Sequence, residues 1–327
     1  MENCISNKHI LFLCFNFYNY NVEIKKKLEE LGARVDMYEQ IKYNLFYTFL
    51  LRLRLGKWYK NRLASKIINT CKNVEYDYIL SLEIKQPEAF YQKLHTLQPK
   101  ARFVLYYWDS IKFFNYLPYI KYFDKVFSFD KDDAEANDSV IYLPLFYIDS
   151  YAAIRTNDVS EKKYDLLFIA SYNEERYHNL ERFLEELPQN VKIYIYLRAT
   201  LGIYIKCALK GLKMKWFGIR KMTQSEIANM YRQCNCVLDF DKKSQSGLTM
   251  RTIESLGAGK KIVTSNKRIK EELFFNQNNI FILGDNNPKA LEDFVKKDFV
   301  SSPRIEDYSI EKWCLKLFAN NVSGELV

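Results

Sequence analysis

Residues 247–266 read GLTMRTIESLGAGKKIVTSN, and this stretch is the most informative part of the chain for predicting the fold. Its first half predicts a short helix, 249–256, that ends at Gly257 and Gly259. The second half predicts a buried strand, 261–264. A helix that runs through a glycine turn into a buried strand is the repeating element of a parallel α/β sheet.

The same stretch carries groups that suit a nucleotide diphosphate. Arg251 and Glu254 stand three positions apart, near the beginning of the predicted helix. An arginine and the N–H groups of a helix N-terminus favour phosphate. A carboxylate one turn further on can accept hydrogen bonds from ribose hydroxyls. Weaker candidates to donate to the same phosphates are Ser246, Gly247 and Thr249.

The alternation of strands and helices runs along the chain twice, which predicts two doubly wound parallel sheets facing each other across a cleft. We expect one domain over 1–150, a second over 151–305 and a C-terminal helical segment, 306–327, that could pack back on the first domain. The first strand lacks the G-x-G-x-x-G signature of a dinucleotide site. A polar and aromatic loop follows it instead, and its Asn16 and Tyr18 are candidates for acceptor contacts.

The net charge of +9 is concentrated in two segments, 40–74 and 187–225, each with eight Lys or Arg and no acidic residue. This pattern indicates anionic partners. Within the first segment, 46–66 mixes cations with aromatic and leucine residues, which suits either an anionic membrane surface or an ordinary helix with solvated charges. The sequence predicts no transmembrane helix and no secretory signal, so we expect a cytoplasmic protein with peripheral membrane contact left open.

Residues 247–259, with Arg251, Glu254 and the Gly-containing turn, resemble the donor-site signature of GT-B glycosyltransferases. The likeness is greatest to the spore-maturation (CgeB-like) and lipopolysaccharide-biosynthesis branch. YDLLFIAS at 164–171, followed by Arg176, resembles the opening of the donor domain, and Trp108-Asp109 resembles an aromatic–Asp element of the acceptor domain. The resemblance implies a GT-B fold, donor contacts from Ser171 and Arg176, and an acceptor contact from Trp108. The second glutamate of many retaining relatives is absent near Gly247.

An inverting transfer needs a base for the acceptor hydroxyl. Asp109, which follows a predicted strand, is the first candidate, although the same position suits a helix N-cap. Glu83, after another strand, is the second. The D-x-D at Asp239 and Asp241 lies in the second predicted sheet, and Asp241 is interpreted as a loop residue facing the cleft. The resemblance to GT-B glycosyltransferases implies that no metal ion is needed for the transfer, and we expect no other cofactor.

The sequence thus predicts a glycosyltransferase that moves a sugar from a nucleotide-diphosphate-sugar donor to a glycan or lipid-linked acceptor. The expected setting is surface polysaccharide, capsule or lipopolysaccharide synthesis. Two alternatives remain at this stage: a non-enzymatic protein that binds nucleotide sugar or nucleic acid, and an epimerase with the GT-B fold. No nucleic-acid motif is present, so nucleic acid is not an expected partner.

Overall fold

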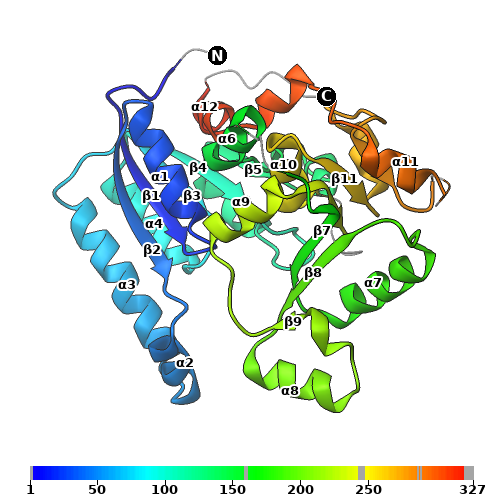
Figure 1. Ribbon diagram of the computed structural model, residues 1–327. Helices are drawn as coiled ribbons and strands as arrows, with labels where there is room; N and C mark the ends of the chain where they lie inside the picture. The colour runs from blue at the N-terminus through cyan, green and yellow to red at the C-terminus, as the bar shows by residue number, and fades with distance from the viewer. Residues whose placement is uncertain (1–2, 158–160, 242–246, 286, 288, 320–327) are drawn as a thin grey trace. The chain divides into compact units, whose positions relative to one another are not determined.

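The computed structural model describes residues 3–157, 161–241, 247–285, 287 and 289–319. They form two compact units (Figure 1). The first contains residues 3–145, 247 and 310–319, and the second contains 146–241 and 248–309 within the described ranges. Each unit is built on one six-stranded parallel sheet, as the β-α-β rhythm predicts.

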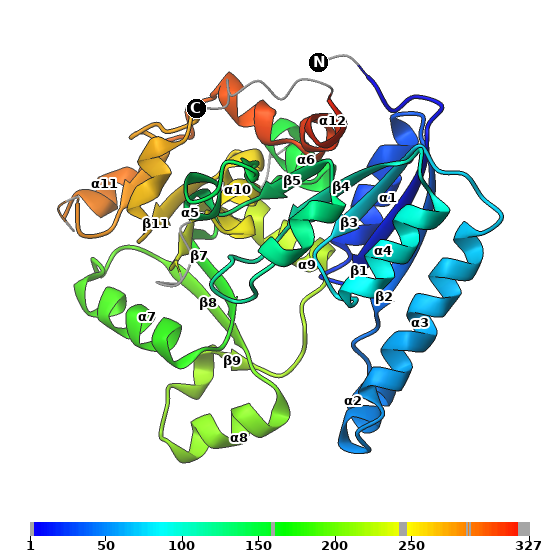
Figure 2. The same cartoon turned by 180° about the vertical axis from the view of Figure 1, so that it is seen from behind.

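The sheet of the first unit has the strand order β2-β1-β3-β4-β5-β6. Its strands are β1 His9–Phe15, β2 Arg34–Ile41, β3 Tyr78–Leu82, β4 Arg102–Tyr107, β5 Lys125–Ser128 and β6 Ile141–Tyr142. Its helices are α1 Tyr20–Glu30, α2 Leu45–Arg52, α3 Gly56–Cys71, α4 Glu88–Leu97, η1 Leu117–Tyr122, α5 Lys131–Glu135 and α12 Ile310–Phe318. Helices α1 and α12 cover one face of this sheet, and α3 and α4 cover the other (Figures 1 and 2).

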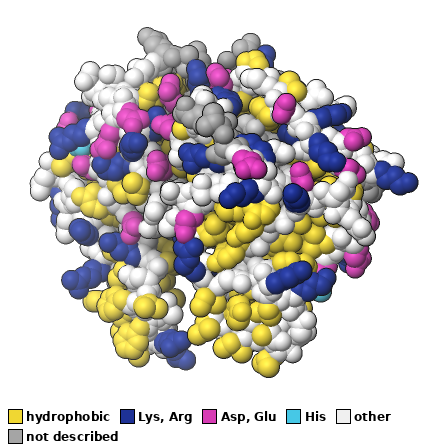
Figure 3. All heavy atoms as spheres, viewed as in Figure 1, with side chains coloured by type: hydrophobic (Ala, Val, Ile, Leu, Met, Phe, Trp, Pro, Cys, Tyr) yellow, Lys and Arg dark blue, Asp and Glu magenta, His cyan; other side chains and the backbone are white. Residues whose placement is uncertain are grey.

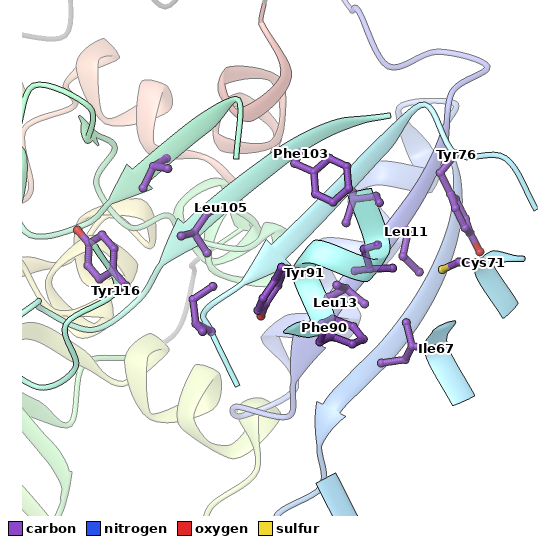
Figure 4. Close-up of a cluster of buried hydrophobic side chains, with 14 of the residues drawn as sticks. Leu11, Leu13, Ile67, Cys71, Tyr76, Phe90, Tyr91, Phe103, Leu105 and Tyr116 are labelled. Atoms are coloured by element: carbon purple, nitrogen blue, oxygen red, sulfur yellow. The ribbon is translucent and has the colours of Figure 1, made fainter. Parts of the chain in front are cut away.

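A continuous apolar core lies between this sheet and helices α3 and α4. Alternate residues of the strands point into it, among them Leu11, Leu13 and Leu105, and aromatic rings fill the space between strands and helices (Figure 4). Strands buried on both faces are expected where helices cover both sides of a parallel sheet. The core holds the carboxyl ends of β1, β3 and β4 next to one another, so the loops that follow them share one edge.

The sheet of the second unit has the order β12-β11-β10-β7-β8-β9. Its strands are β7 Tyr164–Ser171, β8 Ile193–Arg198, β9 Phe217–Gly218, β10 Cys234–Asp239, β11 Lys261–Thr264 and β12 Ile280–Ile282. Its helices are α6 Asp149–Asn157, α7 Glu174–Glu186, α8 Leu201–Leu209, η2 Met214–Trp216, α9 Gln224–Arg232, α10 Met250–Gly257, η3 Lys267–Glu271, α11 Ala290–Lys296 and η4 Pro303–Tyr308. One apolar core packs α7 and α11 on one face, and α10 packs with α6 on the other.

Several local predictions agree with the structure. Thr223, with Glu226 three residues later, predicts a capping box, and this box is formed at the N-terminus of α9. Gly32 follows α1 with a φ of 90°, a conformation that favours glycine. The sequence also predicts a long basic helical region at about 41–70, which the structure divides in two because Arg54 adopts a positive φ of 59° between α2 and α3.

One local prediction was wrong in detail. The sequence predicts a short strand at 215–217, but η2 occupies Met214–Trp216 and β9 begins only at Phe217. The segment after Asp109 is not a helix, since turns occupy it until η1 begins at Leu117. Asp109 is therefore no helix N-cap. That alternative for its role is removed.

Candidate functional site

The donor-site candidates on α10 lie at the carboxyl end of β10. Thr249 is the N-cap of the helix, and its hydroxyl accepts a hydrogen bond from the Thr252 backbone N–H at 3.2 Å. The buried Asp239 ends β10 directly beneath this turn. The strand end and the helix N-terminus are therefore joined by one polar cluster.

Asp239 is the centre of that cluster. Its carboxylate accepts from Arg251 Nη1 at 2.5 Å, from the Thr249 hydroxyl at 2.5 Å and from the Thr252 hydroxyl at 2.8 Å. The Arg251 side chain is about one-fifth exposed, whereas that of Asp239 is almost fully buried. Arginine carries five N–H donors, so this pairing fixes the guanidinium and leaves other donors for an anion.

Glu254 is buried one turn further along α10. Burial raises the pKa of its carboxyl well above the ordinary value. The structure places this group one turn beyond Arg251 on the same helix, as the spacing of the two residues predicts.

The glycines after α10 have a structural role in this unit. A Cβ on Gly257 would lie 2.3 Å from a ring carbon of Tyr147, so only glycine allows α10 to approach that ring. Gly259 has a φ of 67°. Packing against Tyr147 and the backbone conformation thus require glycine at 257 and 259 respectively.

The other residues that the sequence suggests as phosphate donors do not all lie near Arg251. Gly247 belongs to the first unit, where its Cα packs against Phe129 so closely that a Cβ would lie 2.6 Å from the ring. Ser246 falls outside the described residues. Of the three backbone or hydroxyl donors that the sequence suggests, the structure brings Thr249 to the Arg251 cluster.

Ser171 and Arg176 lie together at the end of β7. Arg176 Nη1 donates to the Ser171 carbonyl at 2.7 Å, and Asn173 caps α7 by accepting from the Arg176 backbone N–H at 3.2 Å. β7 pairs with β10 on one side and with β8 on the other. Neighbouring strands are about 4.8 Å apart, so the ends of these three strands form one edge.

Arg198 is a further basic residue at this edge that sequence reasoning missed. It ends β8 directly beside Ser171 in the register of the sheet. Among the described residues, its Nε is one of the few buried side-chain nitrogens without a hydrogen-bond partner. Its place at the carboxyl end of a strand was the signal that could have identified it.

A pocket of about 620 Å³ opens beside the ends of β10, β11 and β12. Its lining includes Phe240, Asp241 and Ser265, together with α7 side chains that are mostly polar or charged: Asn179, Arg182, Phe183 and Glu186. None of the predicted donor residues is among its described lining. Asp241 accepts from the Ser265 hydroxyl, so the two acids of the D-x-D belong to separate networks.

The base candidates of the first unit are brought together by the ends of β3 and β4. Glu83 follows β3, is 1% exposed and has a φ of 62°, which is strained for a non-glycine residue. The buried Gln40 holds this backbone by donating to the Glu83 carbonyl at 3.1 Å. Asp109 follows β4 and is exposed. Gln40 gave no signal in the sequence beyond its position near the end of a strand.

The charge of Asp109 affects the pKa of Glu83. Burial raises the pKa of Glu83 to about 7, the ion pair with Lys85 opposes this shift, and the charge of Asp109 adds to it. The Lys85 ammonium also lies 4.9 Å from the Phe15 ring centroid. The edge therefore presents an exposed carboxylate beside a buried carboxyl that titrates near neutral pH.

The acceptor-side candidates surround an aromatic cluster at the same edge. The Phe17 ring lies 4.9 Å from that of Tyr18 and 5.9 Å from that of Trp108. Asn16 is exposed at the start of this loop, and its side chain accepts from the Asn19 backbone N–H at 3.5 Å. The buried Trp108 directly precedes Asp109 after β4, whereas Phe17 and Tyr18 follow β1, so the loops after these two strands meet at the aromatic cluster.

Within the described residues, no group of three or more His, Cys, Asp or Glu side chains is arranged to hold a metal ion. The described cysteines are free, and six of the seven are buried.

Comparisons with known proteins were made at the levels of sequence and of structure. No protein-family model matches the chain. No curated protein matches it either.

Solved structures do match. An α-glucosyltransferase in complex with UDP and a 13-mer DNA has a TM-score of 0.57 at 13% identity, over 95% of each chain. The lipopolysaccharide outer core galactosyltransferase WaaB has a TM-score of 0.54 at 12% identity, over 95% of this chain and 98% of that one. HepE from Anabaena, in complex with UDP and glucose, has a TM-score of 0.51 at 15% identity, over 95% and 96%.

The fold is GT-B. The likeness to glycosyltransferases covers both units of the chain and agrees with two separate parallel sheets. The fold class predicted from residues 247–266 and from the strand rhythm is thereby confirmed. At these identities the comparison establishes the fold alone, and the CgeB-like branch stays a prediction.

Proposed function

We propose that this protein is a glycosyltransferase that moves a sugar from a nucleotide-diphosphate-sugar donor to a glycan or lipid-linked acceptor. The observation that carries the proposal is Arg251 at the N-terminus of α10, held by Asp239 within a GT-B fold. UDP accompanies two of the similar structures, which supports a nucleoside diphosphate as the group to be bound.

In this proposal the edge of the second sheet binds the donor. Arg251 and the first N–H groups of α10 hold the diphosphate, because a guanidinium and a helix N-terminus both favour phosphate. Arg176 and Ser171 contribute from the β7 loop, and Arg198 adds a further cation. Glu254 binds the ribose hydroxyls. As the sugar departs, the same cations stabilise the negative charge that develops on the diphosphate.

The edge of the first sheet provides the general base for the acceptor hydroxyl. Asp109 accepts the proton of the acceptor hydroxyl while that oxygen forms a bond to the anomeric carbon. The bond between the anomeric carbon and the diphosphate breaks, and its electron pair leaves with the diphosphate. Asp109 is exposed and can contact an acceptor, whereas Glu83 is buried and acts through Asp109 as a positioning group. Trp108, Tyr18 and Asn16 supply the acceptor surface.

We propose synthesis of a surface polysaccharide, capsule or lipopolysaccharide as the setting, with the enzyme peripheral on an anionic membrane on the cytoplasmic side. Support comes from 46–66, where exposed apolar side chains alternate with cations. The exposed apolar residues on and beside α2 and α3 are Tyr43, Leu45, Phe46, Phe49, Leu51, Leu53, Leu55 and Trp58. Such a surface suits an interfacial contact with anionic lipid. No described helix is long and apolar enough to cross a bilayer.

The test is a mass-spectrometric assay of the purified protein with a panel of nucleotide sugars, with and without glycan and lipid-linked acceptors. Transfer to an acceptor supports the proposal. An isomerised donor in the absence of acceptor would instead indicate an epimerase. Binding of oligonucleotides without binding of any nucleotide would indicate a nucleic-acid protein and would exclude the glycosyltransferase.

A further inference from the structure

Helix α8 of the second unit is apolar but not buried. Its sequence is LGIYIKCAL, with one charged residue, and a helix of this composition is normally found inside a core. Among its nine residues, all of them described, Cys207 alone is buried. Leu201, Ile205 and Leu209 are 63%, 50% and 84% exposed. Figure 3 shows the side chains over α8 as a hydrophobic patch on the surface.

The exposed residues form one stripe. Leu201, Ile205 and Leu209 follow each other at intervals of four, which places them on the same side of the helix. Gly202 also faces open space, since no atom lies within 4 Å of an added Cβ. On the other side, Cys207 is buried and the Tyr204 ring lies 6.5 Å from that of Phe217. The helix is therefore attached by one side and leaves its apolar stripe uncovered.

Lysines lie on α8 and directly after it along the chain. The stretch 187–225 contains eight Lys or Arg and no acidic residue, and Lys206 lies within α8 itself. Lys210 pairs with Glu174 at 2.9 Å and Lys213 with Glu181 at 3.6 Å, whereas the exposed Lys206 and Lys215 have no acidic partner among the described residues. A short apolar stripe bordered by lysines is the composition of a helix that lies in the interface of an anionic bilayer.

We infer that α8 is a membrane contact of the second unit, which inserts Leu201, Ile205 and Leu209 into the interface of an anionic bilayer. The charge favours this occupant, because Lys206 on α8 has no acidic partner among the described residues and would meet the same lysine in a symmetric contact with a second copy. This surface is separate from α2 and α3, which belong to the first unit. The inference extends the proposed membrane setting but does not rest on the transfer reaction.

The experiment measures cosedimentation with vesicles of phosphatidylcholine, with and without phosphatidylglycerol. The variant Leu201→Gln/Ile205→Gln/Leu209→Gln is compared with Val300→Gln, which changes another exposed apolar residue of the same unit. We expect the triple variant to partition about tenfold less into anionic vesicles. We expect Val300→Gln to partition as the wild type does. A Phe46→Gln/Phe49→Gln variant, which alters α2, should retain the part of the binding that depends on α8.

Melting temperature and nucleotide binding should be unchanged in the triple variant, because its side chains are on the surface. The inference is overturned if the wild type and the triple variant partition equally into anionic vesicles. It is also overturned if the wild type does not bind vesicles that contain phosphatidylglycerol. A wild-type dimer that dissociates in the triple variant, with vesicle binding unchanged, would assign α8 to self-association instead. Absence of transfer activity in a wild type that binds anionic vesicles normally would count against the proposed function alone.

Discussion

The two sheets are alike in architecture, yet the edges at their carboxyl ends differ in chemistry. The edge of the first sheet places two carboxyl groups together, Glu83 and Asp109, under an aromatic loop. The edge of the second places arginines at the ends of β7, β8 and β10, with one buried carboxylate holding Arg251. One edge suits proton transfer and the other suits an anion. The chemistry of each unit is therefore set by the residues that follow the strands and not by the sheet itself.

The largest effect is expected at Asp109. Asp109→Asn should lower the turnover number by about 10²- to 10⁴-fold, the range of general base catalysis, and leave donor affinity unchanged. Steady-state kinetics together with calorimetric titration of the nucleotide measure both quantities. A normal turnover number for Asp109→Asn would show that Asp109 at the first edge is not the catalytic base.

Glu83 should make stability depend on pH. Its pKa is raised from 4.5 to about 7, so the folded state keeps a proton that the unfolded state has released. Stability is therefore greatest below pH 4.5 with respect to this group and falls as pH rises towards 7. The loss is about 3 kcal/mol, at 1.36 kcal/mol for each pKa unit.

Urea unfolding of wild type and Glu83→Gln between pH 5 and pH 8 tests this linkage. The variant should lose less stability than the wild type as pH rises across this range, because it no longer releases that proton. Glu75→Gln, at an exposed position of the same unit, is the matched control and should keep the wild-type slope. A Glu83→Gln slope identical to the wild type would mean that Glu83 is already ionised in the folded protein.

Arg251→Gln tests the second edge. Loss of hydrogen bonds from a charged group costs about 1.5–3 kcal/mol, so nucleotide affinity should fall about 10- to 100-fold. The substitution also leaves Asp239 buried without its cation, which lowers stability. An Asp239→Asn/Arg251→Gln double variant separates the two effects: stability should recover and affinity should not. Recovery of affinity in the double variant would show that Arg251 serves only to neutralise Asp239.

The smallest effect concerns packing behind the second edge. Gly257→Ala should destabilise the protein by about 1–3 kcal/mol, because the new Cβ would clash with Tyr147. Gly202→Ala is the matched control, since its Cβ would meet no atom within 4 Å and alanine favours a helix. Thermal unfolding compares the two. A Gly257→Ala variant that is as stable as the wild type but binds nucleotide more weakly would show that Gly257 contacts the ligand.

The sequence predicted the fold because its signals are local. Apolar strands, the capping box at Thr223 and the glycine after α1 all depend on neighbours in the chain. The partners of the site residues are not local. Asp239 at the end of β10 pairs with Arg251 on α10, and Gln40 on β2 reaches the Glu83 backbone from another strand. Sequence spacing could place each residue at a strand end, but it could not show which side chains would pair there.

The central claim is that the second unit binds a nucleoside diphosphate through Arg251. The direct test is calorimetric titration of the wild-type protein with UDP, GDP and CMP, repeated with Arg251→Gln and Asp109→Asn. We predict that the wild type binds UDP or GDP more tightly than CMP, that Arg251→Gln binds at least about tenfold more weakly, and that Asp109→Asn binds as the wild type does. Absence of nucleotide binding by the wild type, or equal affinity in Arg251→Gln, would contradict the account.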